Sequence, residues 1–224
     1  MKREISLQDN KIAALIFDMD GLIFDSERIV QKSWTITSKE LGLPDVGAHI
    51  YYTIGFNAVR REEYFFKTFG QTFPSEEFAV LARKNFQAVA EAEGMELKPG
   101  AKELMILAKE LDLKVAVATS SREAHALEML KEANLYQYID GAVYGDRVKN
   151  AKPDPEIYIT ACGVLAVNPA ESIALEDSPA GIQSAHAAGM LPIMIPDLVQ
   201  PDESTSKMCF GCFETLNSVI DLLK

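Results

Sequence analysis

Short apolar runs recur along the chain and are its strongest pattern. Five of them stand out, at residues 12–17, 114–118, 141–144, 172–175 and 191–195. Each run is bounded by Gly, Asp, Ser or Pro, and within it the apolar residues do not alternate cleanly with polar ones. This pattern is typical of strands that are buried on both faces, as in a parallel sheet.

Amphipathic segments precede or separate the last four runs, at residues 101–111, 122–133, 155–166 and 179–188. The last segment has the clearest ends, because Ser178 can act as its N-cap, Pro179 takes the first helical position and Gly189 follows the final turn. Strands that alternate with helices form βαβ units. The sequence therefore predicts the α/β class, with a doubly wound parallel sheet covered by helices on both faces.

The stretch between the first two runs departs from this alternation. Only helical patterns occur there, notably in 26–41 and 75–92. This is too much helix for one crossover, so we expect a helical domain over residues 26–93, inserted into a core formed by 1–25 and 94–224. Its aromatic residues are expected to form a small core rather than a ligand-binding wall. Those residues are Tyr64, Phe65, Phe66, Phe69 and Phe73.

Composition and charge exclude several classes of protein. The 224 residues are 48% hydrophobic and 25% charged, which suits one or two globular domains. With 33 acidic and 22 basic residues the net charge is −11, which argues against a nucleic-acid or anionic-membrane partner. No run approaches the roughly 20 apolar residues of a membrane span, and the three cysteines are too few for a disulfide framework. We expect a cytoplasmic protein, in which Cys209 and Cys212 are ordinary thiols.

Two carboxylates follow the first predicted strand. Asp18 and Asp20 lie two residues apart, so on an extended chain both side chains point the same way, and Gly21 then allows a sharp turn. A buried strand that delivers two acids is costly unless the acids are used. Ligands of open α/β sheets bind at the carboxyl ends of the strands. Asp18 and Asp20 are therefore candidate site residues, although a capping turn would explain the same pattern.

The next two strand ends carry complementary chemistry. Thr119 and Ser120 follow the second strand, and their hydroxyl and N–H groups suit a phosphate. Ser120 or Ser121 would also serve as an ordinary N-cap of the following helix. Lys152 lies past the third strand, beside two prolines that restrict the backbone around it.

The fourth strand ends in a second acidic pair, Glu176 and Asp177. Carboxylate oxygens are the ligands that hard cations prefer. Four adjacent sheet ends thus offer two carboxylate pairs, several hydroxyls and one lysine. Together they predict a site for Mg²⁺ and a phosphoryl group.

Four ordered motifs, spread over nearly the whole chain, carry a resemblance to a known family. They are FDMDGLIFDSE at 17–27, ATSS at 118–121, KPDP at 152–155 and EDSPAG at 176–181. In this order they resemble the motifs of the haloacid dehalogenase superfamily, and within it the branch of β-phosphoglucomutase-like and sugar-phosphate phosphatases. The resemblance implies a Rossmann-like core with an inserted helical cap, a small phosphate ester as substrate, and a monomer.

The resemblance also implies roles for the motif residues. Asp18 is the expected nucleophile, which forms an aspartyl-phosphate, and Asp20 is the expected general acid and base. Thr119, Ser120 and Lys152 are expected to bind phosphoryl oxygens. The expected ligands of Mg²⁺ are Asp18, Asp20 through its carbonyl, Asp177 and Glu176, the last of these directly or through another group.

The branch of the family depends on a few positions. Dehalogenases and phosphonatases do not keep an acid at the position of Asp20, so its presence favours a phosphate ester. β-Phosphoglucomutases carry a His and an Arg in the cap, and the matching positions here fall on Val30 and Ala58. These departures favour a phosphatase that hydrolyses a sugar phosphate. A mutase of the β-phosphoglucomutase type and a non-catalytic phosphate-binding module remain as alternatives.

Substrate identity is expected to depend on the cap, which covers the site and excludes water. Glu27 could bind a sugar hydroxyl, or it could be a favourable acid in the first turn of a helix. Asn57, Arg60 and Arg61 could face the leaving group, or they could form a solvated face. The three histidines match no motif, and we expect them to be structural or at the surface.

Overall fold

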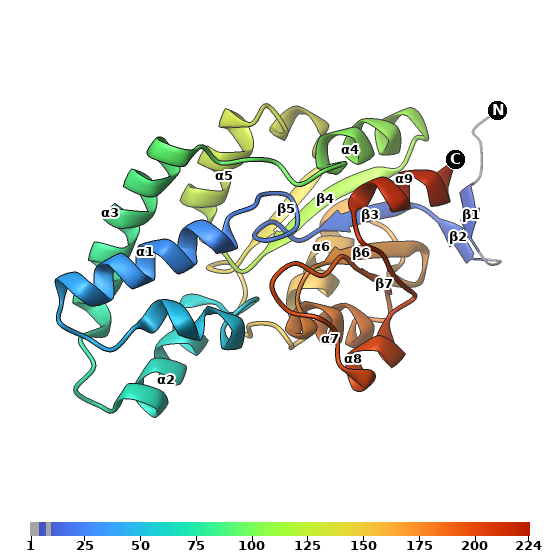
Figure 1. The fold of residues 1–224 in the computed structure, drawn as a ribbon. Coiled ribbons are helices and arrows are strands. Elements are labelled where there is room, and N and C mark those ends of the chain that lie inside the picture. Colours follow the sequence, from blue (N-terminus) through green and yellow to red (C-terminus); the bar gives the residue numbers. More distant parts are fainter. Residues whose placement is uncertain (1–4, 8–9) are drawn as a thin grey trace.

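A six-stranded parallel sheet forms the centre of the molecule. The computed structural model describes residues 5–7 and 10–224, and the strand order is β5-β4-β3-β6-β7-β8 (Figure 1). The strands are β3 (Ala14–Phe17), β4 (Lys114–Thr119), β5 (Gly141–Tyr144), β6 (Ser172–Glu176), β7 (Leu191–Met194) and β8 (Gly211–Cys212). The first five of these coincide with the predicted runs, which confirms the doubly wound α/β core.

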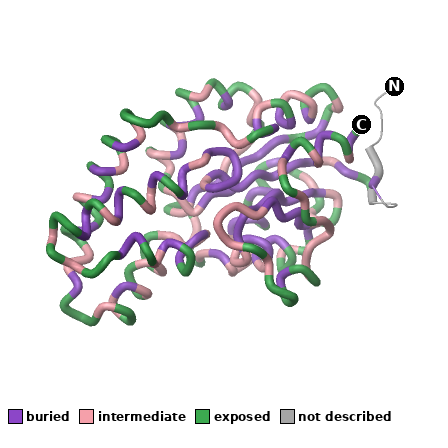
Figure 2. The backbone as a smooth tube through the Cα atoms, in the orientation of Figure 1, coloured by how far each residue is buried: buried purple, intermediate pink, exposed green. Residues whose placement is uncertain are grey.

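Helices cover both faces of this sheet. On one face lie α4 (Ala101–Glu110), α5 (Glu123–Glu132) and α9 (Leu216–Leu223), and on the other lie α6 (Glu156–Leu165) and α7 (Pro179–Ala187) (Figure 1). Leu15 and Phe17 point into the apolar core beneath α4, α5 and α9. Ala14 and Ile16 point into the apolar core beneath α6 and α7. Figure 2 shows the central strands buried, which explains why the runs do not alternate.

A helical cap lies between β3 and β4. It consists of α1 (Glu27–Glu40), the 3-10 helix η1 (Val46–Tyr52), α2 (Ala58–Phe69) and α3 (Ser75–Glu93) (Figure 1). Trp34 and Phe65 lie within a separate apolar cluster, with their ring centroids 5.3 Å apart. The aromatic residues of positions 64–73 belong to this cluster, as expected. The assignment of residues 26–93 as one domain stays a prediction.

Both ends of the described chain contain elements that the sequence did not predict. β1 (Ile5–Leu7) and β2 (Asn10–Ile12) form an antiparallel pair. The stretch 200–212, for which the sequence predicts no element, contains α8 (Glu203–Met208), and β8 pairs parallel with β7. Elements this short leave no periodic pattern in the sequence. Over residues 5–7 and 10–224, no helix combines the length and apolar character that a membrane crossing needs.

The register of the central strands determines which residues meet at the site. Phe17 of β3 pairs with Val117 of β4 on one side and with Leu175 of β6 on the other. The residues that follow in the three strands are Asp18, Ala118 and Glu176. All strands run the same way, so these three residues emerge at the same edge of the sheet.

Candidate active site

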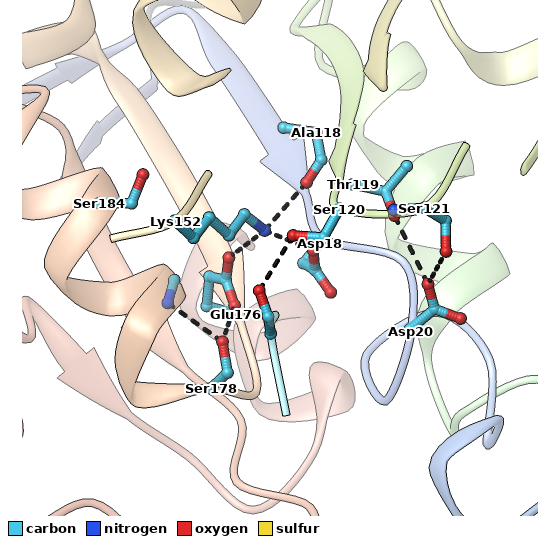
Figure 3. Close-up of polar contacts among 12 residues, drawn as sticks. Asp18, Asp20, Ala118, Thr119, Ser120, Ser121, Lys152, Glu176, Ser178 and Ser184 are labelled. Atoms are coloured by element: carbon cyan, nitrogen blue, oxygen red, sulfur yellow. Dashed lines mark hydrogen bonds and ion pairs between the residues drawn. The ribbon is translucent and has the colours of Figure 1, made fainter. Parts of the chain in front are cut away.

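A buried lysine holds the acidic residues at this edge together. Lys152 Nζ donates to Asp18 Oδ1 at 2.5 Å, to Glu176 Oε1 at 2.6 Å and to the carbonyl of Ala118 at 3.1 Å (Figure 3). Lys152 and Glu176 are almost completely buried, and Asp18 is 6% exposed. Three acceptors match the three protons of the ammonium group, so its position is well determined.

Burial and neighbouring charges change the acidity of these groups. Burial raises the pKa of Asp18 to about 7, although the charge of Lys152 opposes this shift and that of Glu176 adds to it. Burial by itself would lower the pKa of Lys152, but the attraction of Asp18 and Glu176 outweighs burial, and this pKa is raised. Lys152 therefore stays charged at neutral pH and neutralises part of the acidic cluster.

Glu176 has both carboxylate oxygens engaged. Oε1 accepts from Lys152 and from the hydroxyl of Tyr158 at 2.5 Å, while Oε2 accepts from Ser178 Oγ at 3.0 Å. Ser178 also caps α7 by accepting from the N–H of Gly181 at 3.1 Å, which confirms the predicted N-cap. A Cβ at Gly181 would lie 1.9 Å from the carboxylate, so only glycine fits there. Glu176 is thus rigidly held and helps to hold Lys152.

Asp177 contributes a carboxylate oxygen without a partner. Within the described part of the chain, its Oδ2 is the one buried side-chain oxygen or nitrogen that makes no hydrogen bond. One carboxylate oxygen each from Asp18, Glu176 and Asp177 lies within 4.8 Å of the others. Burial, followed by repulsion from Asp18, raises the pKa of Asp177 well above its usual value. A clustered set of oxygens with one unsatisfied member fits a hard divalent cation such as Mg²⁺.

The tight turn after β3 makes room for this oxygen. Gly21 has a φ of +80°, a left-handed conformation that favours glycine. A Cβ at this position would lie 2.2 Å from Asp177 Oδ2. The glycine predicted from the turn is therefore needed for two reasons, backbone conformation and close approach.

Asp20 lies apart from the acidic cluster and is oriented by hydroxyl groups. Ser26 Oγ donates to its Oδ1 at 3.0 Å. Ser121 Oγ donates to its Oδ2 at 2.7 Å (Figure 3). Thr119 Oγ1 lies 3.5 Å from the same Oδ2. Three elements, β3, the start of the cap and the loop after β4, thus contribute to the placement of one carboxylate.

The loop after β4 uses its hydroxyls differently from the sequence prediction. Ser120 Oγ donates to the carbonyl of Gly55 in the cap at 3.0 Å. Ser121, considered only as a possible N-cap, instead binds Asp20, and α5 begins without a side-chain cap. Thr119 Oγ1 accepts from the N–H of Ser121 at 3.0 Å. The N-cap interpretation was wrong, and the phosphate-binding role of Thr119 and Ser120 stays a prediction.

Two ionisable cap residues, Glu27 and Arg61, lie near Asp20 and make no side-chain hydrogen bond to any other described residue. Glu27, the first residue of α1, is buried. Burial and then repulsion from Asp20 raise its pKa to about 8, while Arg61 opposes the shift. Burial lowers the pKa of Arg61, whose guanidinium lies 5.5 Å from the Trp34 ring. Both side chains remain available to a ligand.

The remaining candidates lie away from these charges. His49 Nδ1 is 2.8 Å from the Tyr64 hydroxyl within the cap, and the ring of His125 packs edge-on against Phe86. Val30, at the position of the mutase histidine, packs against the apolar cluster of the cap. These contacts agree with the structural roles expected for the histidines.

Sequence reasoning missed the roles of two residues that support the site, because Tyr158 was not considered and Arg60 was considered only for the leaving group or a solvated face. Tyr158 lies on the buried face of α6 and donates to Glu176. A tyrosine on an otherwise apolar helix face was the available signal, because a buried hydroxyl needs a partner. Arg60 donates to the main-chain carbonyl of Lys152 at 2.6 Å, a contact across 92 residues for which the sequence contains no signal.

Comparison with known proteins bears directly on this arrangement. A family model described as haloacid dehalogenase-like hydrolase matches residues 15–195, a range that contains every site residue described above. The chain belongs to this family. The four motifs of the hydrolase thus lie in the expected order on the expected fold, and the resemblance seen in the sequence is confirmed.

Relatives of this hydrolase include named phosphatases. It is 31% identical over 177 residues to the phosphorylated carbohydrates phosphatase of Thermotoga maritima, which covers 79% of this chain and 82% of that protein. It is 31% identical over 196 residues to hexitol phosphatase B of Escherichia coli (strain K12), covering 83% and 84% of the two chains. The crystal structure of β-phosphoglucomutase from Clostridium difficile matches with a TM-score of 0.76 at 22% identity over 93% of each chain, which shows a shared fold.

Proposed function

We propose that this hydrolase is a Mg²⁺-dependent phosphatase that cleaves a small phosphate monoester, a sugar phosphate, through an aspartyl-phosphate. The observation that carries the proposal is the meeting of three buried carboxylates and one buried lysine at the carboxyl edge of the sheet. Phosphoryl transfer depends mainly on positioning and on neutralising charge, which such a cluster can supply. The names of the two curated relatives support a phosphorylated carbohydrate as the substrate class.

Asp18 is the proposed nucleophile. Its Oδ1 is bound by Lys152, while its Oδ2 makes no hydrogen bond to another described residue. Attack of Oδ2 on phosphorus forms the aspartyl-phosphate and breaks the bond to the leaving oxygen, which takes a proton from Asp20. Asp20 then removes a proton from the water that attacks the phosphorus. Inorganic phosphate leaves, and the carboxylate of Asp18 is restored.

The remaining residues would bind charge. Asp18, Asp177 and the carbonyl of Asp20 would hold Mg²⁺, which when bound would neutralise phosphoryl oxygens. Lys152 would exchange one of its three hydrogen bonds for a further phosphoryl oxygen, which Thr119 and Ser120 would also bind. We assign Glu176 to the positioning of Lys152, since both of its oxygens are already engaged.

The cap would contact the leaving group. Glu27 and Arg61 lie near Asp20, which by this mechanism must reach the leaving oxygen. Glu27 keeps 7% of its surface exposed, and a carboxyl group that makes no hydrogen bond within the described chain can exchange hydrogen bonds with a substrate hydroxyl. We therefore propose that Glu27 binds a hydroxyl of the sugar. Val30 and Ala58, at the positions of the two mutase residues, favour hydrolysis over transfer back to the sugar.

The test is phosphate release from a panel of sugar phosphates, β-glucose 1-phosphate included, with and without Mg²⁺. We expect release that needs Mg²⁺, complete loss in Asp18→Asn, and a loss of roughly 10²–10⁴-fold in Asp20→Asn. Asp221→Asn, an exposed acid on α9, is the matched control and should keep wild-type rates. Conversion of β-glucose 1-phosphate to glucose 6-phosphate without release would support the mutase instead. Phosphate binding without either reaction would support a binding module.

A further inference from the structure

Lys152, the proposed phosphate-binding lysine, is hydrogen-bonded through both its side chain and its main chain. Its ammonium group contacts Asp18, Glu176 and the carbonyl of Ala118. Its own carbonyl accepts from Arg60 Nη1 at 2.6 Å. Arg60 belongs to α2 of the cap, whereas Lys152 lies in the core, so this hydrogen bond joins the two parts of the molecule.

The guanidinium of Arg60 is itself held in place. It lies over the ring of Phe56, with 3.8 Å between Cζ and the ring centroid. The main-chain N–H of Arg60 donates to Asn57 Oδ1 at 3.0 Å, the N-cap bond of α2. The Phe56 ring restricts the guanidinium group, and the N-cap bond fixes the main chain of Arg60. Together they direct the Arg60 side chain toward Lys152.

The cap segment that carries Arg60 also contacts two other loops of the site. We call residues 55–60 the docking segment. The carbonyl of Gly55 accepts from Ser120 Oγ at 3.0 Å, in the loop after β4. Gly55 has a φ of +78°, and a Cβ there would lie 2.7 Å from Oγ of Ser178, in the loop after β6. The docking segment therefore touches three of the loops that carry the proposed active-site residues.

We infer that Arg60 is a positioning residue, which fixes the main chain of Lys152 only while the docking segment lies against the core, as it does in this structure. The inference rests on the proposed function and assigns Arg60 a role different from the leaving-group contact considered from sequence. A cap movement that separates the docking segment from the core must break the bond, because its donor and acceptor lie on opposite sides. Closure over the substrate and the final placement of Lys152 then occur together.

Two measurements on Arg60→Gln test this role. We expect calorimetric titration with inorganic phosphate, at saturating Mg²⁺, to show affinity reduced roughly tenfold, because Lys152 is less well placed. We expect kcat/KM to fall by a similar factor for a sugar phosphate and for acetyl phosphate, whose leaving group is too small to reach the cap. Arg60→Lys keeps the positive charge and reaches further than the amide of Gln, so it should recover part of both losses. Arg83→Gln, an exposed arginine of α3, should change neither.

Three results would overturn the inference. Unchanged phosphate affinity in Arg60→Gln would mean that Lys152 does not depend on Arg60. A loss confined to the sugar phosphate would assign Arg60 to the leaving group. A loss that Arg60→Lys does not reduce, accompanied by a lowered melting temperature, would mean a structural role alone. A wild-type protein that binds phosphate but hydrolyses no ester would contradict the proposed function, and the titration would still decide the role of Arg60.

Discussion

Asp177 buries a carboxylate oxygen that no hydrogen-bond donor of the described chain contacts. Leaving a buried charged oxygen unpaired costs several kcal/mol in most proteins, so such atoms are rare. Its nearest charged neighbours, Asp18 and Glu176, are also acids and add repulsion. A divalent cation would remove both costs at once, so metal binding should stabilise the fold.

We expect Mg²⁺ to raise the melting temperature of the wild-type protein by several degrees. Free ligand at about a hundredfold excess over Kd contributes about 2.7 kcal/mol to the folded state. Asp177→Asn should abolish most of this rise and leave the metal-free protein at least as stable as the wild type, because a buried acid that is repelled by Asp18 and Glu176 is gone. Thermal melts with EDTA and with Mg²⁺ measure both effects, and Asp221→Asn is the control. A full Mg²⁺ response in Asp177→Asn would contradict the proposed metal site.

The raised pKa of Glu27 predicts how the stability of the protein depends on pH. Its pKa is about 8 in the folded protein and near 4.5 in an exposed glutamate. The folded state therefore keeps a proton that the unfolded state loses between pH 4.5 and 8, so this residue reduces stability as the pH rises through that window. Glu27→Gln removes the dependence. Relative to wild type, the variant should gain on the order of a few kcal/mol between pH 5 and 8.5.

Urea unfolding of the metal-free proteins across this range measures that gain. Glu76→Gln is the matched control, because Glu76 is also an acid in the first turn of a cap helix but is exposed. The difference in free energy of unfolding between Glu76→Gln and the wild type should be the same at every pH. Parallel curves for Glu27→Gln as well would show that Glu27 is not protonated when buried.

At the scale of elements, two linkers connect the cap to the core and pair with each other. The N–H of Asp25 donates to the carbonyl of Glu96 at 3.0 Å, and the N–H of Lys98 donates to the carbonyl of Ile23 at 2.8 Å. Asp197, in the loop after β7, accepts from Lys98 Nζ at 2.8 Å and from Nη1 of Arg28, in α1, at 2.8 Å. Its side chain is 3% exposed, so one buried carboxylate joins the second linker and the cap helix α1 to the core.

Removal of that carboxylate should loosen the cap. Asp197→Asn leaves two cations with a weaker acceptor, and we expect it to lower the free energy of unfolding by roughly 1–3 kcal/mol. Cleavage within the linkers by a protease should also become faster, since local opening exposes them. Urea unfolding and limited proteolysis measure these effects, with Asp221→Asn as the reference variant. Equal stability and equal cleavage rates in the two variants would mean that Asp197 does not restrain the cap.

At the scale of the whole molecule, the apolar residues fall into separate clusters. Two clusters lie on the two faces of the sheet, and a third lies inside the cap around Trp34 and Phe65. The contacts between cap and core described above are mostly polar, at the docking segment and around Asp197. Polar contacts exchange with water at little net cost, and of the core residues that the structure describes only the partly buried Leu198 and Val199 pack against the cap cluster, so a change of cap orientation disturbs little apolar packing. This division suits a site that must admit a substrate and then exclude water.

The sequence by itself determined the class of fold and where its chemistry lies. Runs without alternation predicted the buried strands, because a strand covered on both faces must be apolar throughout. The ends of those strands supplied Asp18, Lys152, Glu176 and Asp177, which the structure brings together. Local patterns sufficed here because the rules of parallel sheets place successive strand ends at one edge.

Only the tertiary structure decided which partner each polar group takes. Ser121 binds Asp20 rather than capping α5, Tyr158 holds Glu176, and Arg60 holds the main chain of Lys152. The partners in the first and last of these pairs lie about a hundred residues apart, so no periodicity or motif relates them. Such choices follow from the angle at which the cap meets the core and from which buried groups need a donor. Both are properties of the packed molecule. A local sequence pattern predicts that a residue is buried, but it does not predict which residue will be its hydrogen-bond partner.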